Sequence, residues 1–143
     1  ISVAIVRIGI VLDKSGGALA KMLLPFKMGV GGKVGPGTQF MSWITLEDLI
    51  GVLHHSALTE ELTGPTNGVA EAVTNYDFTK ALGRALRRPT IFPMPAFAAR
   101  LAFGEMADAL LLSSTRVKSN RLVESGYVFK HGEIGPALEA LVR

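Results

Sequence analysis

The fold follows from one stretch near the start of the chain, Val3-Ala4-Ile5-Val6-Arg7-Ile8-Gly9-Ile10-Val11-Leu12. It is β-branched and apolar apart from Arg7 and Gly9, which is typical of a strand buried on both faces of a parallel sheet. A turn at residues 13–17 separates it from a helical pattern over Ala18 to Lys27, which Pro25 should end or kink. A buried strand followed directly by a helix predicts an α/β protein.

The alternation of strands and helices continues along the chain. Two further strands are predicted, over Phe40 to Ile44 and over Thr66 to Ala70. Thr45 and Thr74 each precede an aspartate by three residues, the spacing of a helix capping box. The helix after Thr45 is expected to bury Leu46, Leu49, Ile50, Leu53 and Ala57. The helix after Thr74 is expected to bury Phe78, Ala81, Leu82 and Ala85.

The second half of the chain is more helical and less regular. An extended segment is predicted over Thr90 to Met94, and helices from Pro95 to Phe103, over Glu105 to Leu112 and over Ser119 to Ser125. A last helix carries Ile134, Ala137, Leu138, Leu141 and Val142. We therefore expect residues 1–72 to form the end of a sheet with a covering glycine-rich loop, and residues 73–143 to form a small, mostly helical domain.

Composition limits the class of protein. The 143 residues are 48% hydrophobic and 19% charged, which predicts one compact unit with a sizeable core. The net charge of +3 is mild and spread out, so it does not favour nucleic acid as a partner. The lack of cysteine excludes disulfides and thiolate metal sites. No apolar run approaches the roughly 18 residues that span a bilayer, and no signal-peptide pattern is seen. Because the chain opens directly on a strand without an initiator methionine, we expect a piece of a longer protein or a processed end.

Two motifs suggest nucleotide chemistry and fail on closer reading. The loop from Gly29 to Gly37 has Val34 where a dinucleotide fingerprint needs its third glycine, and Val34 also breaks the Walker pattern after Lys33. We expect a mobile or substrate-covering loop. Tyr76 and Lys80 have the Y-x-x-x-K spacing of a proton-transfer pair. Because Tyr76 lies in the first turn after a capping residue and no cofactor-binding half precedes it, we interpret the pair as a structural helix N-terminus.

Other ionisable groups are interpreted as surface features. His54 and His55 point in different directions from one helix, which favours a surface pair over a metal site. Glu105 and Asp108 are interpreted as a solvated helix N-terminus. The middle of the chain is basic, mainly as a solvated face, although an arginine there could meet an anionic substrate. The basic residues are Arg84, Arg87, Arg88, Arg100, Arg116, Lys118 and Arg121.

Several stretches occur in an order that matches a known family. The first is Arg7-Ile8-Gly9-Ile10-Val11-Leu12 with Gly16-Gly17-Ala18. The most specific is Leu24-Pro25-Phe26-Lys27-Met28-Gly29-Val30-Gly31-Gly32 followed by Gly35-Pro36-Gly37-Thr38-Gln39-Phe40-Met41-Ser42-Trp43-Ile44. Later ones are Asn67-Gly68-Val69-Ala70, Pro93-Met94-Pro95-Ala96-Phe97, Phe103-Gly104-Glu105, Arg116-Val117 and Gly126-Tyr127. Together they resemble the C-terminal portion of extended short-chain dehydrogenase/reductases, in the NAD-dependent epimerase/dehydratase-like branch of epimerase-family proteins or cell-division inhibitors. Ser119 departs from that pattern, because the family often has proline there.

The resemblance implies a fold and a set of sites. The fold would be the last parallel strands of a Rossmann-like sheet plus a small, mostly helical substrate-side domain. The backbone at Gly9, Ile10 and Val11 would lie near the nicotinamide end of NAD(P). Met22, Phe26, Gln39 and Trp43 would lie on the substrate side. The family's cofactor fingerprint and catalytic tyrosine–lysine pair would precede Ile1, so no catalytic residue and no metal ligand is assigned to this chain.

The leading functional hypothesis is therefore the C-terminal substrate-binding portion of an NAD(P)-dependent nucleoside-sugar epimerase/dehydratase-like oxidoreductase. The chain by itself is expected to bind no cofactor and to be inactive. Its expected partner is a nucleotide-sugar-like small molecule, its expected location is the cytoplasm, and neither nucleic acid nor membrane is expected as a partner. The alternative is a non-enzymatic interaction module linked to cell division. An exposed sheet edge could also support self-association.

Overall fold

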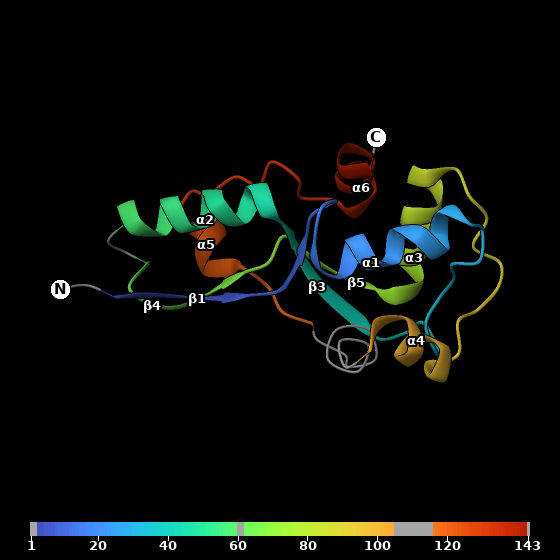
Figure 1. Cartoon of the computed structure of the whole chain (residues 1–143). Helices are drawn as coiled ribbons and strands as arrows, with labels where there is room; N and C mark the ends of the chain where they lie inside the picture. Colours follow the sequence, from blue (N-terminus) through green and yellow to red (C-terminus); the bar gives the residue numbers. More distant parts are fainter. Residues whose placement is uncertain (1–2, 60–61, 105–115, 143) are drawn as a thin grey trace.

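The computed structural model describes residues 3–59, 62–104 and 116–142 and has a mixed α/β fold with parallel strands (Figure 1). One sheet pairs β1 (Ala4–Ile8) with β4 (Gly64–Gly68) in parallel. The other has the order β2 (Ile10–Leu12), β3 (Phe40–Thr45), β5 (Glu71–Thr74), with β2 parallel and β5 antiparallel to β3. The predicted fold class is confirmed.

The stretch Val3–Leu12, predicted as one strand, is divided at Gly9 between the two sheets. Gly9 donates its N–H to the Gly68 carbonyl at 3.4 Å, at the join of β1 and β2. A Cβ at Gly9 would lie 2.6 Å from the Ser42 carbonyl oxygen of β3. The chain can pass from one sheet to the other here because no side chain occupies that space.

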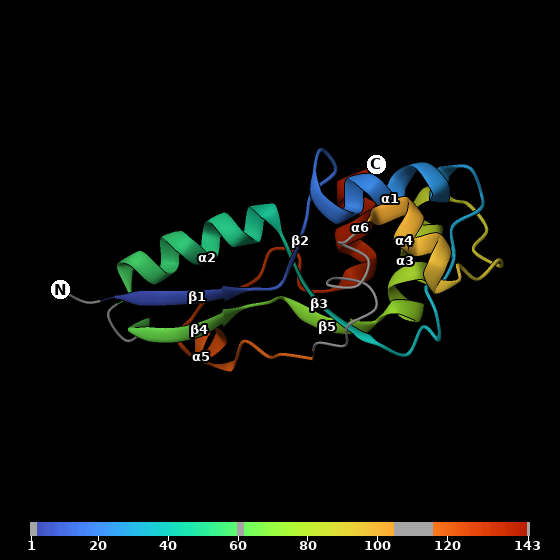
Figure 2. The same ribbon diagram turned by 60° about the horizontal axis from the view of Figure 1, so that its bottom comes forward.

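The helices gather around the two sheets. Helix α2 (Leu46–Leu58) contacts β1, and the short helix α5 (Asn120–Glu124) contacts β4 (Figure 2). The other helices lie around β2, β3 and β5 at the other end of the molecule (Figure 1). They are α1 (Gly17–Lys27), α3 (Asn75–Leu86), α4 (Ala96–Phe103) and α6 (Ile134–Val142). Among the described residues, no helix is both long and apolar enough to cross a membrane.

Two hydrophobic clusters form the core. The larger one joins β2, α1, β3 and α3 and includes Leu12, Phe26, Trp43 and Phe78. The smaller one joins α2 to α5 through Leu49, Val52 and Leu122. Both clusters draw residues from either side of residue 72, and the division of the chain at that point stays a prediction.

The predicted N-terminal caps of α2 and α3 are confirmed, whereas the predicted buried face of α2 is largely wrong. Thr45 and Thr74 accept backbone N–H groups of Asp48 and Asp77, as the capping pattern predicts. Helix α3 buries Phe78, Ala81, Leu82 and Ala85 as expected. Helix α2 buries Leu49, but the prediction for Leu46, Ile50, Leu53 and Ala57 is wrong, since these residues are exposed. The reason is that α2 turns Leu49 and Val52 toward the smaller cluster, and apolar spacing alone does not say which apolar face is covered.

Other differences are local. Helix α1 continues through Pro25 to Lys27. Strand β5 was not predicted, and the strand predicted at Thr66 to Ala70 lies at Gly64–Gly68. The helix predicted over Glu105 to Leu112, with its pair Glu105 and Asp108, lies outside the described residues.

The segment around Ser119 is fastened to the sheets by side-chain hydrogen bonds. Ser119 Oγ donates to the Val69 carbonyl and accepts the Val69 N–H at 2.9 Å. Ser42 Oγ accepts the N–H of Val117 at 3.1 Å. A serine at position 119, where the resembling family often has proline, therefore supplies two bonds that proline cannot make.

Asp48 fastens the C-terminal segment to the start of α2. Its buried carboxylate accepts the Tyr127 hydroxyl at 2.8 Å, the Lys130 N–H at 2.9 Å and the His131 N–H at 2.9 Å. Beside it, Glu47 pairs with the Lys130 ammonium and the His131 ring. Burial, together with the bond to Asp48, raises the pKa of Tyr127 above its ordinary value of 10.0. A buried carboxylate without such donors would be costly, so Asp48 and residues 127–131 depend on each other.

Gly9→Ala should destabilise the chain by about 1–3 kcal/mol, because the added methyl group meets the Ser42 carbonyl, which is backbone and can move little. Urea unfolding followed by circular dichroism measures the loss. Gly135→Ala is the matched control, since a Cβ there meets nothing within 4 Å and alanine suits a helix better than glycine. Equal stability of the two variants would contradict the close approach at Gly9.

Tyr127→Phe should lower stability by about 1.5–3 kcal/mol near neutral pH, because it removes a hydrogen bond to a charged acceptor. The raised pKa adds a pH dependence. The folded chain holds the phenol proton more tightly than the unfolded chain, so this contribution is complete below about pH 10 and is lost as pH rises above it. Urea unfolding between about pH 9 and 11 should therefore show a steeper loss for the unsubstituted chain than for Tyr127→Phe. Tyr76→Phe, at an exposed position, is the control and should keep the steep loss.

Candidate functional site

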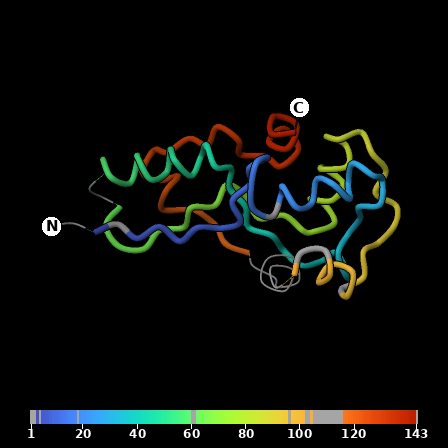
Figure 3. Tube along the Cα trace, viewed as in Figure 1, coloured from blue at the N-terminus to red at the C-terminus, as the bar shows by residue number. Residues whose placement is uncertain are grey.

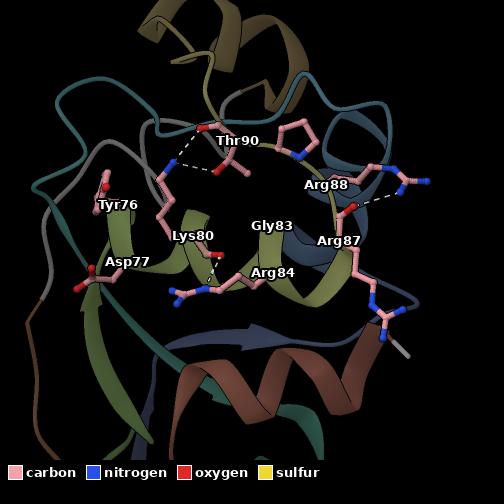
Figure 4. Close-up of a pocket in the computed structure, with 9 residues that line it drawn as sticks. Tyr76, Asp77, Lys80, Gly83, Arg84, Arg87, Arg88 and Thr90 are labelled. Carbon is pink, nitrogen blue, oxygen red and sulfur yellow. Dashed lines mark hydrogen bonds between the residues drawn. The ribbon is translucent and has the colours of Figure 1, made fainter.

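An open depression of about 700 Å³ lies along α3 and the segment that follows it (Figure 4). We call it the basic groove. It is lined by Tyr76, Asp77, Lys80, Gly83, Arg84, Arg87, Arg88, Pro89 and Thr90. Four of these side chains are cationic and one is anionic, which makes the groove strongly positive.

Helical spacing places these side chains together. Tyr76, Lys80 and Arg84 are four residues apart and therefore share one face of α3. The helix ends at Arg87, whose φ of 56° is left-handed and turns the chain back along the helix. The returning Thr90 then lies so close to Gly83 that a Cβ there would be 2.6 Å from the Thr90 methyl group. Thr90 therefore packs directly on the backbone of Gly83, which is buried.

Three of the four cationic side chains of the groove donate hydrogen bonds to backbone carbonyl groups. Lys80 Nζ donates to the carbonyl and the hydroxyl oxygen of Thr90, each at 3.1 Å. Arg84 Nε donates to the Lys80 carbonyl at 3.3 Å. Arg88 Nε donates to the Lys27 carbonyl at 2.9 Å. These bonds use only part of each donor set, and Figure 4 shows the guanidinium groups spread around the rim of the groove.

Tyr76 and Lys80, the Y-x-x-x-K pair, both line the basic groove. The Lys80 ammonium lies 5.4 Å from the centroid of the Tyr76 ring and is hydrogen-bonded to Thr90. A smaller cavity of about 100 Å³ beside it is shared by Tyr76, Lys80 and Thr90 with Lys33 of the glycine-rich loop. The contact is a cation over an aromatic face, which explains the pair by packing.

A second depression of about 600 Å³ is acidic and lies between β5, α3 and α6. Its carboxylates are Glu71, Asp77, Glu133 and Glu139. Burial raises the pKa of Glu71, partly offset by the N–H that Ile134 donates to it at 3.2 Å. Within residues 3–59, 62–104 and 116–142, no three histidine or acidic side chains are grouped closely enough to hold a metal ion.

The residues predicted near the cofactor lie together at the join between the sheets. Gly9 separates β1 from β2, Ile10 packs against the larger cluster and Val11 against the smaller one. They follow the carboxyl end of β1, which is where parallel sheets bind their ligands. Their contact with a cofactor stays a prediction.

The residues predicted on the substrate side are buried in the described part of the chain. Met22, Phe26 and Trp43 belong to the larger cluster, with Trp43 fully buried. Gln39 is buried and donates from Nε2 to the Val34 carbonyl at 2.9 Å. None of the four lines the basic groove or the acidic depression. Their contact with a substrate also stays a prediction.

The sequence patterns missed two groupings. The first is the basic groove, whose arginines were interpreted as a solvated face and whose Tyr76 and Lys80 were interpreted as a helix N-terminus. The spacing of four residues from Tyr76 to Lys80 and on to Arg84 was the signal that places these side chains on one side of a helix. His55 was read as half of a surface pair, but it is half-buried, bonds Ser125 Oγ at 2.9 Å and packs edge-on against Tyr127. Those contacts join segments about 70 residues apart, which no local pattern reveals.

The chain is similar in sequence to known proteins over nearly its whole length. Residues 94–141 match a family described as a domain of unknown function (DUF1731). The chain is 41% identical over 140 residues to epimerase family protein SDR39U1 of Bos taurus, covering 96% of this chain and 48% of that protein. It is 44% identical over 137 residues to epimerase family protein MT2273 of Mycobacterium tuberculosis, covering 95% and 46%. The chain thus spans about half the length of these relatives.

Solved structures give the same result. The crystal structure of human epimerase family protein SDR39U1 with NADPH superposes with a TM-score of 0.87 at 39% identity, over 95% of this chain and 46% of that one. UDP-N-acetylglucosamine 4-epimerase from Bacillus cereus superposes with a TM-score of 0.70 at 12% identity, over 95% and 44%, which shows a shared fold. The chain belongs to the epimerase protein family of the short-chain dehydrogenase/reductase fold and corresponds to the C-terminal part of its members.

Proposed function

We propose that this chain supplies the substrate-side part of an NAD(P)-dependent nucleoside-sugar epimerase/dehydratase-like oxidoreductase and that it neither binds the dinucleotide nor catalyses without the other part. The observation that carries the proposal is the likeness to the human relative with NADPH, which extends over 95% of this chain but only 46% of that protein. The remaining half of such a protein is needed to complete the cofactor site.

The surface around β1 supports a missing neighbour. Among the described strands, β1 pairs only with β4, so its other edge carries free backbone hydrogen-bonding groups. Ile5 is 53% exposed and Ile8 is 49% exposed, although both lie in a strand of a parallel sheet. Parallel sheets are normally covered on both faces.

Helix α2, which contacts β1, also carries exposed apolar side chains. Its residue Ile50 is 61% exposed, and the same outward side of the helix carries further exposed apolar side chains. We define the β1–α2 face as Val3, Ile5, Ile8, Leu46, Ile50, Leu53 and Leu58. A set of apolar side chains of this size is typical of a surface that packs against another protein part.

The predicted sites fit that arrangement. Gly9, Ile10 and Val11 follow β1 directly and would face a dinucleotide held by a strand added at the free edge. Met22, Phe26, Gln39 and Trp43 would then support the substrate side from within the larger cluster. Cofactor chemistry, meaning hydride transfer by NAD(P), would come from the completed protein.

NADPH titrated into the chain alone should show no saturable stoichiometric binding by calorimetry or by nicotinamide fluorescence. Mixing the chain with the separately expressed preceding half of the Mycobacterium tuberculosis relative should restore binding, since that relative is 44% identical to this chain over the part they share. Ile50→Asp should abolish the restoration by placing a charge in the interface, whereas Glu124→Gln, an exposed change on α5, should not. Tight one-to-one binding of NADPH by the chain alone would overturn the proposal.

A further expectation concerns the β1–α2 face. Without its other half the chain would self-associate through the free edge of β1, and sedimentation velocity at rising concentration would reveal dimers that Ile5→Lys removes.

The alternative function, a non-enzymatic module linked to cell division, would instead retain a division protein in a pull-down while binding no small molecule. A cytoplasmic location belongs to the oxidoreductase proposal and is checked by imaging a fluorescent fusion.

A further inference from the structure

The basic groove lies at the opposite end of the molecule from β1. Figure 3 shows β1 at one end of the trace, and α3 and the segment that follows it at the other. None of the residues of the β1–α2 face lines the groove. A function for the groove is therefore independent of how the β1 edge is completed.

Within the lining of the groove, positive charges outnumber negative ones. Lys80, Arg84, Arg87 and Arg88 face a single carboxylate, that of Asp77, within the lining. In the described ranges, ion pairs are formed by Lys130 and His131 with Glu47, and none is formed by these four cations. Positive charges gathered in a concave surface raise the local concentration of anions.

A structural role explains only part of this charge. The C-terminus of α3 carries partial negative charge, which favours cations in its last turn, and Arg84 and Arg87 lie there. Lys80 lies more than one turn earlier and is held by Thr90 from the returning segment. Arg88 is outside the helix and is fastened to the end of α1 through the Lys27 carbonyl. Helix capping therefore accounts for Arg84 and Arg87 but not for Lys80 and Arg88, which line the same cavity.

We propose that the basic groove binds the phosphate group of a small phosphorylated molecule. The phosphate would lie in the open part of the groove, next to the Lys80 ammonium. Lys80 Nζ, with two donors engaged by Thr90, has a third N–H for the anion. Arg84 and Arg87 approach from the rim, since exposed side chains change rotamers within nanoseconds. The planar fork of arginine suits phosphate oxygens.

The size and layout of the groove favour a small anion over a nucleic acid. The cations surround one cavity of about 700 Å³, which is in the range of small-molecule sites. A backbone-tracking surface would need a row of cations along the protein and usually stacked aromatic side chains. Tyr76 is the one aromatic residue of the lining, and its ring is covered by the Lys80 ammonium.

The test is a titration of the whole chain with inorganic phosphate and with pyrophosphate at constant ionic strength, followed by 1H–15N spectra. Constant ionic strength matters because salt screens exposed charges. Saturable shifts are expected in the amides of residues 76–90, with pyrophosphate binding more tightly than phosphate. Acetate, a monovalent oxyanion, should cause no saturable shift.

Variants then separate the groove from general positive charge. Arg84→Gln combined with Arg87→Gln should weaken pyrophosphate binding about tenfold, because each lost arginine removes charge-assisted hydrogen bonds. Arg7→Gln combined with Arg116→Gln removes the same charge from exposed positions outside the groove and should leave the affinity unchanged. Circular dichroism melting confirms that both variants fold. Equal affinities in the two double variants would overturn the proposal.

Competition with a single-stranded RNA oligomer is the last part of the test. Competition in which pyrophosphate displaces the RNA from residues 76–90 supports a phosphate site. RNA binding that pyrophosphate does not displace, and that both double variants weaken equally, would instead identify a general polyanion surface and overturn the proposal. None of these measurements needs a dinucleotide or a completed β1 edge, so their failure is distinguishable from a failure of the proposed function.

Discussion

The backbone of β1 can form hydrogen bonds along two edges, and in the described part of the chain only the edge toward β4 is paired. Parallel strands rarely tolerate such an edge, because their side chains are apolar on both faces and a free edge pairs readily with other strands. The exposed isoleucines of β1 and the exposed outer side of α2 follow from the same condition. A strand paired with the second edge of β1, as proposed, would account for these features together.

The rest of the fold is held by contacts between distant segments. Gly9 lets one continuous stretch serve two sheets, because the Ser42 carbonyl occupies the space of a side chain. Asp48 uses its buried carboxylate to fasten residues 127–131 to the start of α2, and Ser119 fastens its segment to Val69. These polar bonds hold the C-terminal segments on the sheets, and the larger cluster packs α6 against α3.

Local patterns predicted the elements better than their surroundings. The capping threonines Thr45 and Thr74 and the buried face of α3 depend on spacings within one helix, so they could be predicted from the sequence. The buried face of α2 could not, because Leu49 and Ile50 are equally apolar and contacts with distant segments, such as Leu122 of α5, decide which one is covered. The division at Gly9 depends on β3, which lies about thirty residues further along the chain. The basic groove lies within residues 76–90, and the left-handed turn at Arg87, which brings Thr90 back along α3, is the part that the helical spacing does not reveal.

The central claim is that the free edge of β1 is completed by another half of the same kind of protein. Amide hydrogen exchange of residues 4–8 measures this directly, in the chain alone and after fusion to the preceding half of the human relative. In the chain alone, alternate amides of β1 should exchange rapidly while those bonded to β4 are protected, and fusion should protect both sets. Identical protection of β1 before and after fusion would contradict the account.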